Sequence, residues 1–413
     1  MIRRDFLGRT GLASLALGLP ATSFAADGEL PDLAASAKPI TTGERQARIA
    51  KAGALMREYD IDAVLVEAGS SMVYFTGVHW WRSERLTAAV MTREGEIAIV
   101  TPFFEEPSVR ETLAVPAEVL PWDEDENPLA AIAAWLEKRG LTGGRIGIEE
   151  TVRFFASDGL RAVLPNAAIV SANPVVRGCR MIKSPTELAL MQVATEITMR
   201  AYRHAYTRIE AGMTPSDIGG IINGAVRQMG GTPEFALVLL GEASAYPHGS
   251  DKPQEVREGE VVLMDCGCNV HGYQSDVSRS YVHGGANKQQ RMVWNQMRQG
   301  QQIAFDAAQP GRPAGEVDDA VRSFYQTLGY GPGYKLPGTS HRTGHGIGLD
   351  GHEPLNLVHG ETTRLAPGMC FSDEPGIYIP GSYGIRVEDC FYMTESGPRW
   401  FSTPPSSIDD PIG

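Results

Sequence analysis

Cysteine is scarce in this chain. Five occur among 413 residues, which is too few for a disulfide framework at this length. Two of them form Cys266-Gly267-Cys268, but no second cysteine pair stands at the spacing that a zinc knuckle requires. We therefore expect all five to be small core residues: Cys179, Cys266, Cys268, Cys370 and Cys390.

Basic residues are few relative to acidic ones. The chain has 37 Lys and Arg against 50 Asp and Glu, so its formal net charge at pH 7 is −13. Proteins that bind nucleic acid or anionic membranes attract phosphate with clustered positive charge. The composition therefore argues against both as partners. A hydrophobic content of 42% is ordinary for a globular protein with a large core.

Long apolar runs are missing beyond the N-terminus, so we expect no membrane span in the mature chain. The first 26 residues are typical of a targeting segment. Arg3-Arg4-Asp5-Phe6-Leu7 forms a twin-arginine start, residues 10–20 are apolar, and Ser23-Phe24-Ala25 offers small residues for cleavage. We predict a periplasmic or exported protein that uses the twin-arginine route. The alternative is a cytosolic protein with a chance arginine pair.

Helix and strand patterns alternate through the first half of the chain. Strands are expected at residues 63–66, 88–91, 97–101, 145–148 and 168–170, and helices at 42–59, 105–113, 128–139 and 154–164. This alternation predicts an α/β domain with a largely buried sheet. No metal-ligand cluster, phosphate loop or nucleophile elbow occurs in this half of the sequence.

The pattern changes near residues 175–183. Ser184-Pro185 followed by Glu187 is a capping-box sequence that starts a helix to about residue 208. A second helix is expected from Thr214 to Met229. We therefore divide the chain into a signal segment (1–26), an N-terminal domain (27–180) and a C-terminal domain (181–413).

Two predicted hairpins each carry a pair of carboxylates. A turn centred between Val270 and His271 places Asp265 directly opposite Asp276, with Cβ atoms about 5 Å apart. A turn at Gly381 likewise places Glu374 opposite Glu388. Buried carboxylates this close repel each other unless a cation lies between them. In the alternative reading, one aspartate caps the turn and the other is solvated.

Histidines complete the candidate ligand set. The glycine-rich segment 343–354 holds His345 and His352, seven positions apart. Four carboxylates and one imidazole suit two hard or borderline divalent cations, provided that the fold brings them together. For His341 a structural role is favoured.

These segments resemble the motifs of a known family, the pita-bread metallopeptidases, in the branch of creatinase, aminopeptidase P and prolidase. D-x-G-x-x-x-x-G-Y-x-S-D is met by residues 265–276, and G-H-G-I-G-x-x-x-H-E by residues 344–353. E-P-G-I-Y is met by residues 374–378, G-I-R-V-E-D by 384–389, and P-H-G by 247–249. The resemblance implies an N-terminal creatinase-type domain followed by a pita-bread catalytic domain, and commonly a homodimer.

The resemblance also implies the roles of the site residues. Asp265, Asp276, His345, Glu374 and Glu388 would be the ligands of two divalent metal ions, with Asp276 and Glu388 bridging them. His248 and His352 would contact the substrate, with His352 protonated, and Glu374 would also move a proton. Manganese is the expected metal, with cobalt or zinc as alternatives. All five ligand types are present, which argues against a metal-free hydrolase and against a binding protein that has lost the site.

The activity implied is hydrolysis of peptide bonds next to proline, as an Xaa-Pro aminopeptidase or dipeptidase, by a hydroxide shared between two metal ions. Some prolidases hold the free carboxylate of a dipeptide with an arginine that follows the H-E pair. This chain has Asn356 there instead. The alternative is therefore a hydrolase or lyase of this fold that acts on a small non-peptide amide or zwitterion. We expect Arg386 to pair with a site carboxylate and to contact the substrate; a purely structural salt bridge is the alternative.

Overall fold

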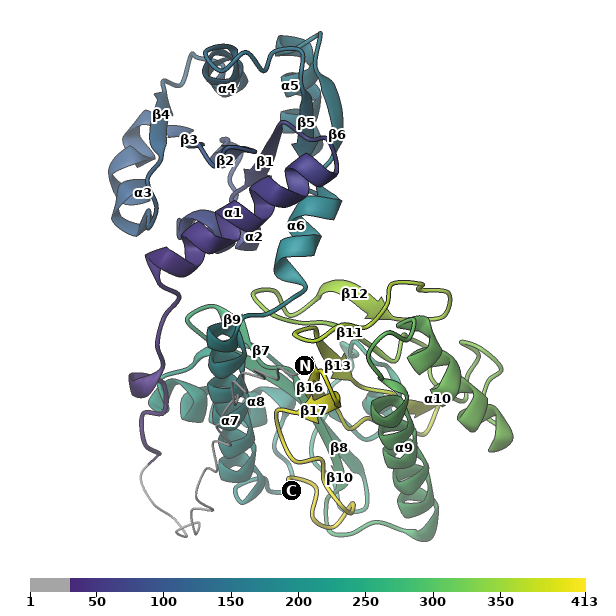
Figure 1. The fold of residues 1–413 in the computed structure, drawn as a ribbon. Helices are drawn as coiled ribbons and strands as arrows, with labels where there is room; N and C mark the ends of the chain where they lie inside the picture. Colours follow the sequence, from purple (N-terminus) through teal and green to yellow (C-terminus); the bar gives the residue numbers. More distant parts are fainter. Residues whose placement is uncertain (1–29) are drawn as a thin grey trace, which may run out of the picture.

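The computed structural model describes residues 30–413, so the predicted signal segment lies outside the described part of the chain. Two lobes are visible in Figure 1. The upper lobe carries α1 to α6 and β1 to β6, and the lower lobe carries the remaining elements. Both lobes mix helices with strands, in agreement with the α/β prediction.

A six-stranded sheet forms the N-terminal domain, in the order β4-β3-β2-β1-β5-β6. Its strands are β1 (Ala63–Glu67), β2 (Ala88–Thr92), β3 (Ile97–Pro102), β4 (Glu118–Trp122), β5 (Arg145–Ile148) and β6 (Ala168–Ser171). Its helices are α1 (Thr42–Glu58), α2 (Ser70–Thr76), α3 (Glu106–Thr112), α4 (Pro128–Glu137), α5 (Phe154–Val163) and α6 (Asn173–Arg180). Val64 and Val66 pack with α1 and α2, whereas Ala63 and Leu65 pack with α4 and α5. Helices therefore cover both faces of the central strand, which is why its sequence is a continuous apolar run.

Three elements of this domain were not predicted. The helix α2 is only seven residues long, and its N-cap residue is Gly69, so it lacks a capping side chain. The strand β4 is an edge strand that contains Pro121 and is only partly buried, so it shows little apolar alternation. The helix α6 occupies much of the segment in which we placed the change of domain.

Two long helices open the C-terminal domain, as predicted. The helix α7 (Pro185–Tyr206) starts at a capping box in which Ser184 accepts from the backbone of Glu187. The helix α8 (Pro215–Gln228) starts at the same kind of box, formed by Thr214 and Asp217. Each box satisfies amide groups that a helix start otherwise leaves unpaired.

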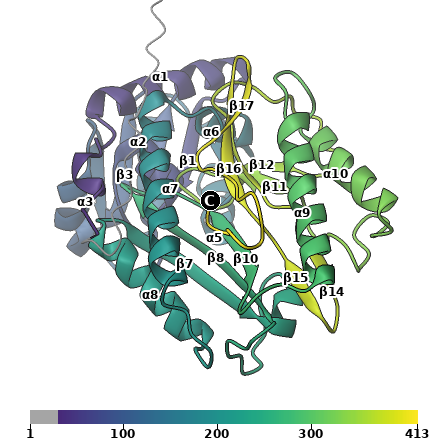
Figure 2. The ribbon, with the colours of Figure 1, turned by 90° about the horizontal axis from the view of Figure 1, so that it is seen from below.

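The strands of this domain form three further sheets. One has the order β10-β8-β7 with β9 paired to β8, one has the order β12-β11-β13-β16-β17, and the third pairs β14 with β15. Figure 2 shows α7 and α8 on one side of these strands and α9 (Lys288–Ala307) and α10 (Gly315–Thr327) on the other. The strands are β7 (Thr232–Leu240), β8 (Val261–Val270), β9 (Tyr273–Gln274), β10 (Val277–Val282), β11 (Gly344–Gly346), β12 (Glu353–Leu357), β13 (Cys370–Asp373), β14 (Ile377–Ile379), β15 (Tyr383–Ile385), β16 (Asp389–Thr394) and β17 (Gly397–Trp400).

The central strand β8 explains why the carboxylate of Asp265 points into the C-terminal domain. Val262 and Met264 belong to the core cluster that contains α7 and α8, whereas Val261 and Leu263 belong to the cluster of α9 and α10. Because side chains alternate along a strand, Asp265 shares the face of Val261 and Leu263. The strand therefore directs this aspartate into the interior of the domain.

The five cysteines are buried and unbonded, as expected of core residues. Within residues 30–413, no helix combines the length and apolar character that crossing a bilayer requires.

Candidate metal centre

The first hairpin differs from the prediction by one residue at its turn. His271 and Gly272 both have positive φ, and Val270 pairs with Tyr273. Asp265 therefore stands opposite Ser278, and the prediction that it directly faces Asp276 was wrong. A two-residue turn of this type needs two central residues with positive φ, and Gly272 supplies one at little cost. Its amide also donates to Oδ1 of Asn269, at 3.0 Å.

The corrected register still brings the two aspartates together. Asp276 lies in the break between β9 and β10, diagonally across from Asp265. Diagonal neighbours on one face remain within reach of each other. Ligand oxygens of Asp265, Asp276 and Glu388 all lie within 4.8 Å of one another.

The second hairpin has the predicted register. Asp373 pairs with Asp389 on one side, and Ile377 pairs with Ile385 on the other, with the turn around Gly381. Glu374 and Glu388 lie between these pairs at equivalent positions. Glu388 also connects the two hairpins, because it forms an antiparallel bridge with Ser278. The backbone amides of these two residues donate to each other's carbonyls at 3.0 and 3.2 Å.

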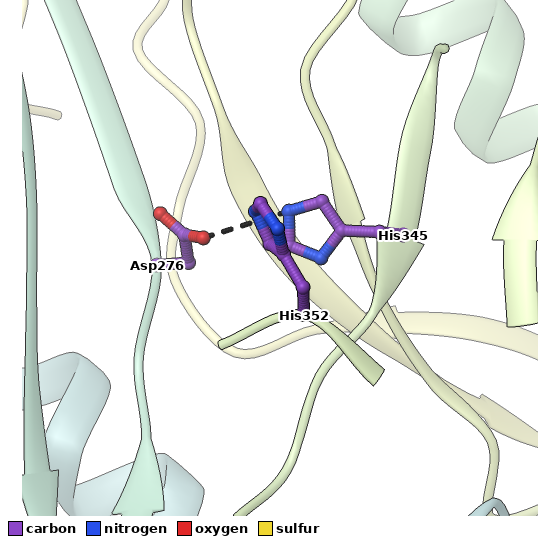
Figure 3. Close-up of side chains that lie close together, drawn as sticks. All are labelled: Asp276, His345 and His352. Carbon is purple, nitrogen blue, oxygen red and sulfur yellow. Dashed lines mark ion pairs between the residues drawn. The ribbon is translucent and has the colours of Figure 1, made fainter. Parts of the chain in front are cut away.

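His345 reaches the centre from β11. Its Nδ1 lies 3.0 Å from the carbonyl oxygen of Gly346, which leaves Nε2 facing the carboxylates. Nε2 is 3.3 Å from Oε1 of Glu374 and 3.6 Å from Oδ2 of Asp276. Figure 3 shows Asp276 and His345 pointing toward each other, with His352 beside them.

The glycines around His345 allow the strands to pack closely. A Cβ at Gly344 would lie 2.0 Å from the carbonyl oxygen of Ser372, and one at Gly346 would lie 2.7 Å from that of Glu353. Any side chain at these positions would push β11 away from its neighbours. The glycine-rich sequence is thus required to place the imidazole.

Burial gives the four carboxylates an unfavourable electrostatic environment. It raises the pKa of Asp276 well above its usual value, and the charges of Asp265 and Glu374 raise it further. The pKa of Glu388 is raised well above its usual value by burial and then by Asp276. Burial also raises the pKa of Glu374, but the hydrogen bond to His345 and the charges of His345, His341 and Arg386 together outweigh it and lower the pKa.

One cation of the protein pairs directly with this group. Arg386 is 3% exposed and forms an ion pair with Oδ2 of Asp265, which is the pairing expected from the sequence. Its Nε donates to Ser278 at 2.9 Å and its Nη1 to the hydroxyl of Tyr378 at 3.2 Å. Burial raises the pKa of Asp265, although Arg386 opposes the shift. The substrate-binding role of Arg386 stays a prediction.

The donor set fits divalent cations. Oδ1 of Asp265 is buried and has no hydrogen-bond partner among the described residues. Glu388 belongs to a group with Asp265 and Asp276 and to another with His345 and Glu374, so one carboxylate is shared between two potential sites. Carboxylates with one imidazole are ligands that manganese, cobalt and zinc accept. Two divalent cations would also relieve the repulsion among the buried carboxylates.

A cavity of about 890 Å³ opens onto these residues. It is lined by all five candidate ligands and by His248, His352 and Arg386. His341 and Arg342 also line it, which the sequence did not indicate; Nε2 of His341 lies 2.8 Å from the hydroxyl of Tyr378. The i, i+4 spacing of His341 to His345 was the available signal, and it was read as structural.

The charge of His352 differs from the expectation. Burial, together with His345 and Arg342, lowers the pKa of His352 to about 4. This pKa favours a neutral imidazole at pH 7, in contrast to the protonated His352 expected from the sequence. It also lies close enough to Asp276 and His345 for the three to form a further candidate ligand group.

Buried ion pairs outside the centre hold the segment that carries His352. Glu353 accepts from Nζ of Lys183 at 2.9 Å and also from Arg180, which reaches Asp350 as well at 2.7 Å. Burial opposes ionisation of Glu353, yet Lys183 and Arg180 lower its pKa to about 2. The hydroxyl of Ser70, from the N-terminal domain, donates to Asp350. Sequence patterns gave no signal for this network.

Comparison with protein families supports the class that the fold and site define. Residues 48–182 match the creatinase/prolidase N-terminal domain, and residues 189–395 match the metallopeptidase family M24. The chain belongs to metallopeptidase family M24 and is an enzyme with a creatinase-type N-terminal domain and a pita-bread catalytic domain.

Individual relatives extend over most of the chain. It is 32% identical to an uncharacterized peptidase of Schizosaccharomyces pombe, across 89% of this chain and 83% of that protein. It is 30% identical to the Xaa-Pro dipeptidase of Lactobacillus helveticus, across 84% of this chain and 94% of that protein. The crystal structure of dipeptidase PepE from Mycobacterium ulcerans superposes with a TM-score of 0.82 at 28% identity, covering 90% and 98% of the two chains.

Proposed function

We propose that this enzyme hydrolyses the peptide bond that precedes proline, in Xaa-Pro peptides. The observation that carries the proposal is the convergence of four carboxylates and one imidazole on a cavity large enough for a short peptide. The names of its relatives support the same reaction, since the Lactobacillus helveticus protein is an Xaa-Pro dipeptidase.

Asp265, Asp276, His345, Glu374 and Glu388 would hold two divalent cations, which we propose to be manganese. When bound, such cations supply positive charge that lowers the pKa of water and polarises a carbonyl group. The protein contributes a fixed arrangement of oxygen and nitrogen donors. Arg386 positions Asp265, and the backbone bridge between Ser278 and Glu388 fixes the two hairpins relative to each other.

Glu374 is placed to move a proton. It lies at the cavity surface, and the hydroxyl of Ser372 donates to its Oε1 at 3.2 Å. A carboxylate in this position can accept a proton from attacking water and deliver it to the leaving nitrogen. When the bond precedes proline, that nitrogen becomes a secondary amine, and its protonation completes bond cleavage.

His248 and His352 line the cavity and belong to different segments. A neutral imidazole still donates one N–H, so His352 can hydrogen-bond the substrate carbonyl as negative charge develops on its oxygen. His248 lines the same cavity and can bind the substrate there.

The decisive test is a substrate panel with metal analysis of the same sample. Purified protein with Mn²⁺ should cleave Xaa-Pro dipeptides or tripeptides and leave matched Xaa-Ala peptides largely intact. Absence of cleavage across the panel, in protein shown to contain metal, would overturn the proposal.

Asn356 favours a second candidate function, with a different class of substrate. Because an amide cannot grip a carboxylate as arginine does, a small non-peptide amide or zwitterion remains an alternative substrate class. Activity on such compounds, but not on peptides, would select it.

We also propose a location and an oligomeric state. The twin-arginine start suggests a periplasmic location, which replacement of both Arg3 and Arg4 by lysine would test by cell fractionation. A homodimer is proposed from the resemblance alone, and light scattering during size-exclusion chromatography would test it.

A further inference from the structure

A second cavity lies between the two domains. It has a volume of about 400 Å³, which is within the usual range of small-molecule pockets. Its lining includes Arg45 and Arg48 of α1 and Val73 of α2 on one side, and the turn that joins β8 to β9 on the other. Figure 1 shows β9 at the boundary between the two lobes. A ligand bound in this cavity would therefore contact both domains.

The lining carries basic side chains and no acidic ones. Besides the two arginines it contains His79 and His271, and within residues 30–413 no aspartate or glutamate lines it. The whole chain has the opposite balance, with 50 acidic residues against 37 Lys and Arg. A concave site lined by charge of one sign attracts ligands of the other sign. The cavity is therefore suited to an anion.

Arg48 is already neutralised by the protein. Its Nη2 lies 3.0 Å from Oε1 of Glu187 and donates to the hydroxyl of Tyr273 at 2.7 Å. Only 8% of its side chain is exposed. This arginine therefore joins α1 to α7 and β9, and its charge is not free for a ligand.

Arg45 has no such partner. Its Nη1 donates to the carbonyl oxygens of Val73 and Tyr74, and its Nε is buried without a hydrogen-bond partner among the described residues. The carboxylate of the neighbouring Glu44 is engaged in the capping box of α1. Burial and the charge of Arg48 lower the pKa of Arg45, so a negative charge beside this guanidinium would be stabilising.

Apolar side chains form much of the remaining wall. Pro39 and Ile40 come from the segment before α1, and Val270 and Leu349 come from the C-terminal domain. A ligand that fills the cavity would bury an apolar part against these residues, which favours binding. An inorganic oxyanion would gain nothing from them.

We propose that this interdomain cavity binds a small organic anion, whose carboxylate pairs with Arg45 and whose apolar part contacts Ile40 and Leu349. Guanidinium and carboxylate groups form charge-assisted hydrogen bonds that are often bidentate. The site is distinct from the metal centre, because the two cavities share no lining residue. It nevertheless borders the metal centre, since Gln274 lines the larger cavity and donates to the carbonyl oxygen of Leu349 at 3.1 Å. The proposal does not depend on which substrate the enzyme cleaves.

Calorimetric titration of the Mn²⁺-loaded enzyme with hexanoate tests the proposal. Hexanoate should bind about tenfold more tightly than neutral hexanamide, which lacks the charge that pairs with arginine. It should also bind more tightly than acetate, which lacks the apolar chain. Tighter binding of sulfate than of hexanoate would overturn the assignment to an organic anion.

Two matched variants locate the bound hexanoate. Arg45→Gln should weaken its binding by about tenfold, because the charge-assisted hydrogen bonds are lost. Arg57→Gln is the control, because Arg57 is an exposed residue of the same helix and lies outside the cavity lining. Hexanoate held at the metal centre would bind equally to wild type and to both variants, and this result would overturn the proposal.

If Arg45→Gln fails to fold, Thr232→Glu decides. This variant keeps Arg45 and adds a carboxylate at an exposed position of the lining, so hexanoate binding should be lost. Thr362→Glu adds the same charge at an exposed position outside the lining and should leave the affinity unchanged. Equal affinities of these two variants for hexanoate would overturn the proposal.

Discussion

Arg386 and Asp265 form a buried ion pair that uses only one carboxylate oxygen. The guanidinium binds Oδ2, and Oδ1 is left without a hydrogen-bond partner among the described residues. The arginine thus orients the carboxylate and leaves one oxygen free for a cation.

Replacing this arginine should weaken metal binding. Arg386→Gln should lower the affinity for Mn²⁺ and the value of kcat by about 10- to 100-fold, as is typical for partners that orient metal ligands. Calorimetric titration of metal-free protein measures the affinity. Arg364→Gln is a suitable control, because Arg364 is exposed and lies outside the cavity lining. Unchanged metal affinity in Arg386→Gln would contradict the orienting role.

Alanine variants of His345 and His352 should differ in metal content. Both approach Asp276, but only His345 is assigned as a ligand here. His345→Ala should lose about one metal ion per chain. His352→Ala should keep both ions while kcat falls by about 10²- to 10⁴-fold. Elemental analysis beside activity distinguishes the two, and loss of metal in His352→Ala would make it a ligand.

Removing the metal ions with a chelator should make the free energy of unfolding fall as pH rises. The pKa values of Asp276 and Glu388 are raised in the folded protein, so the folded state binds more protons than the unfolded state above about pH 4. The contribution of these two groups to stability is then greatest at low pH and declines as they ionise. Melting temperatures of metal-free protein should decrease from pH 5 to pH 8 more steeply than those of Mn²⁺-loaded protein. Identical pH profiles would show that the carboxylates do not depend on cations.

Glu353 should have the opposite pH dependence. Its pKa is lowered from 4.5 to about 2 in the folded protein, so its contribution is complete above about pH 4.5 and is lost as pH falls toward 2. Glu353→Gln should destabilise the protein by about 3 kcal/mol at neutral pH, because Lys183 and Arg180 lose a buried partner. In thermal unfolding at pH 7, 4 and 3, the difference in melting temperature between Glu353→Gln and the wild type should become smaller as the pH falls. Glu395→Gln, at an exposed position, should show no such trend.

The two hairpins show how much of the site could be predicted from sequence. The register expected around Glu374 and Glu388 holds for the flanking pairs, because the reversal at Gly381 is sharply marked. The register at Asp265 was wrong because the turn type depends on the φ values of His271 and Gly272, which the residue types alone do not fix. The aspartates still meet, since diagonal neighbours share a face.

Contacts between distant segments could not be predicted. The network of Glu353 joins residues about 170 positions apart, and no local pattern encodes such a contact. The reduced pKa of His352 likewise depends on burial that only the folded chain creates. The α/β class and the long capped helices were predictable, because periodicity and caps are local.

The catalytic half of this enzyme is not self-contained. A fragment that begins after Arg180 would keep Lys183 but lack the second cation that pairs with Glu353 and the hydroxyl of Ser70 that holds Asp350. The loop bearing His352 would then be held by fewer contacts. The N-terminal domain thus helps to position the loop that carries His352, even though none of the candidate metal ligands comes from this domain.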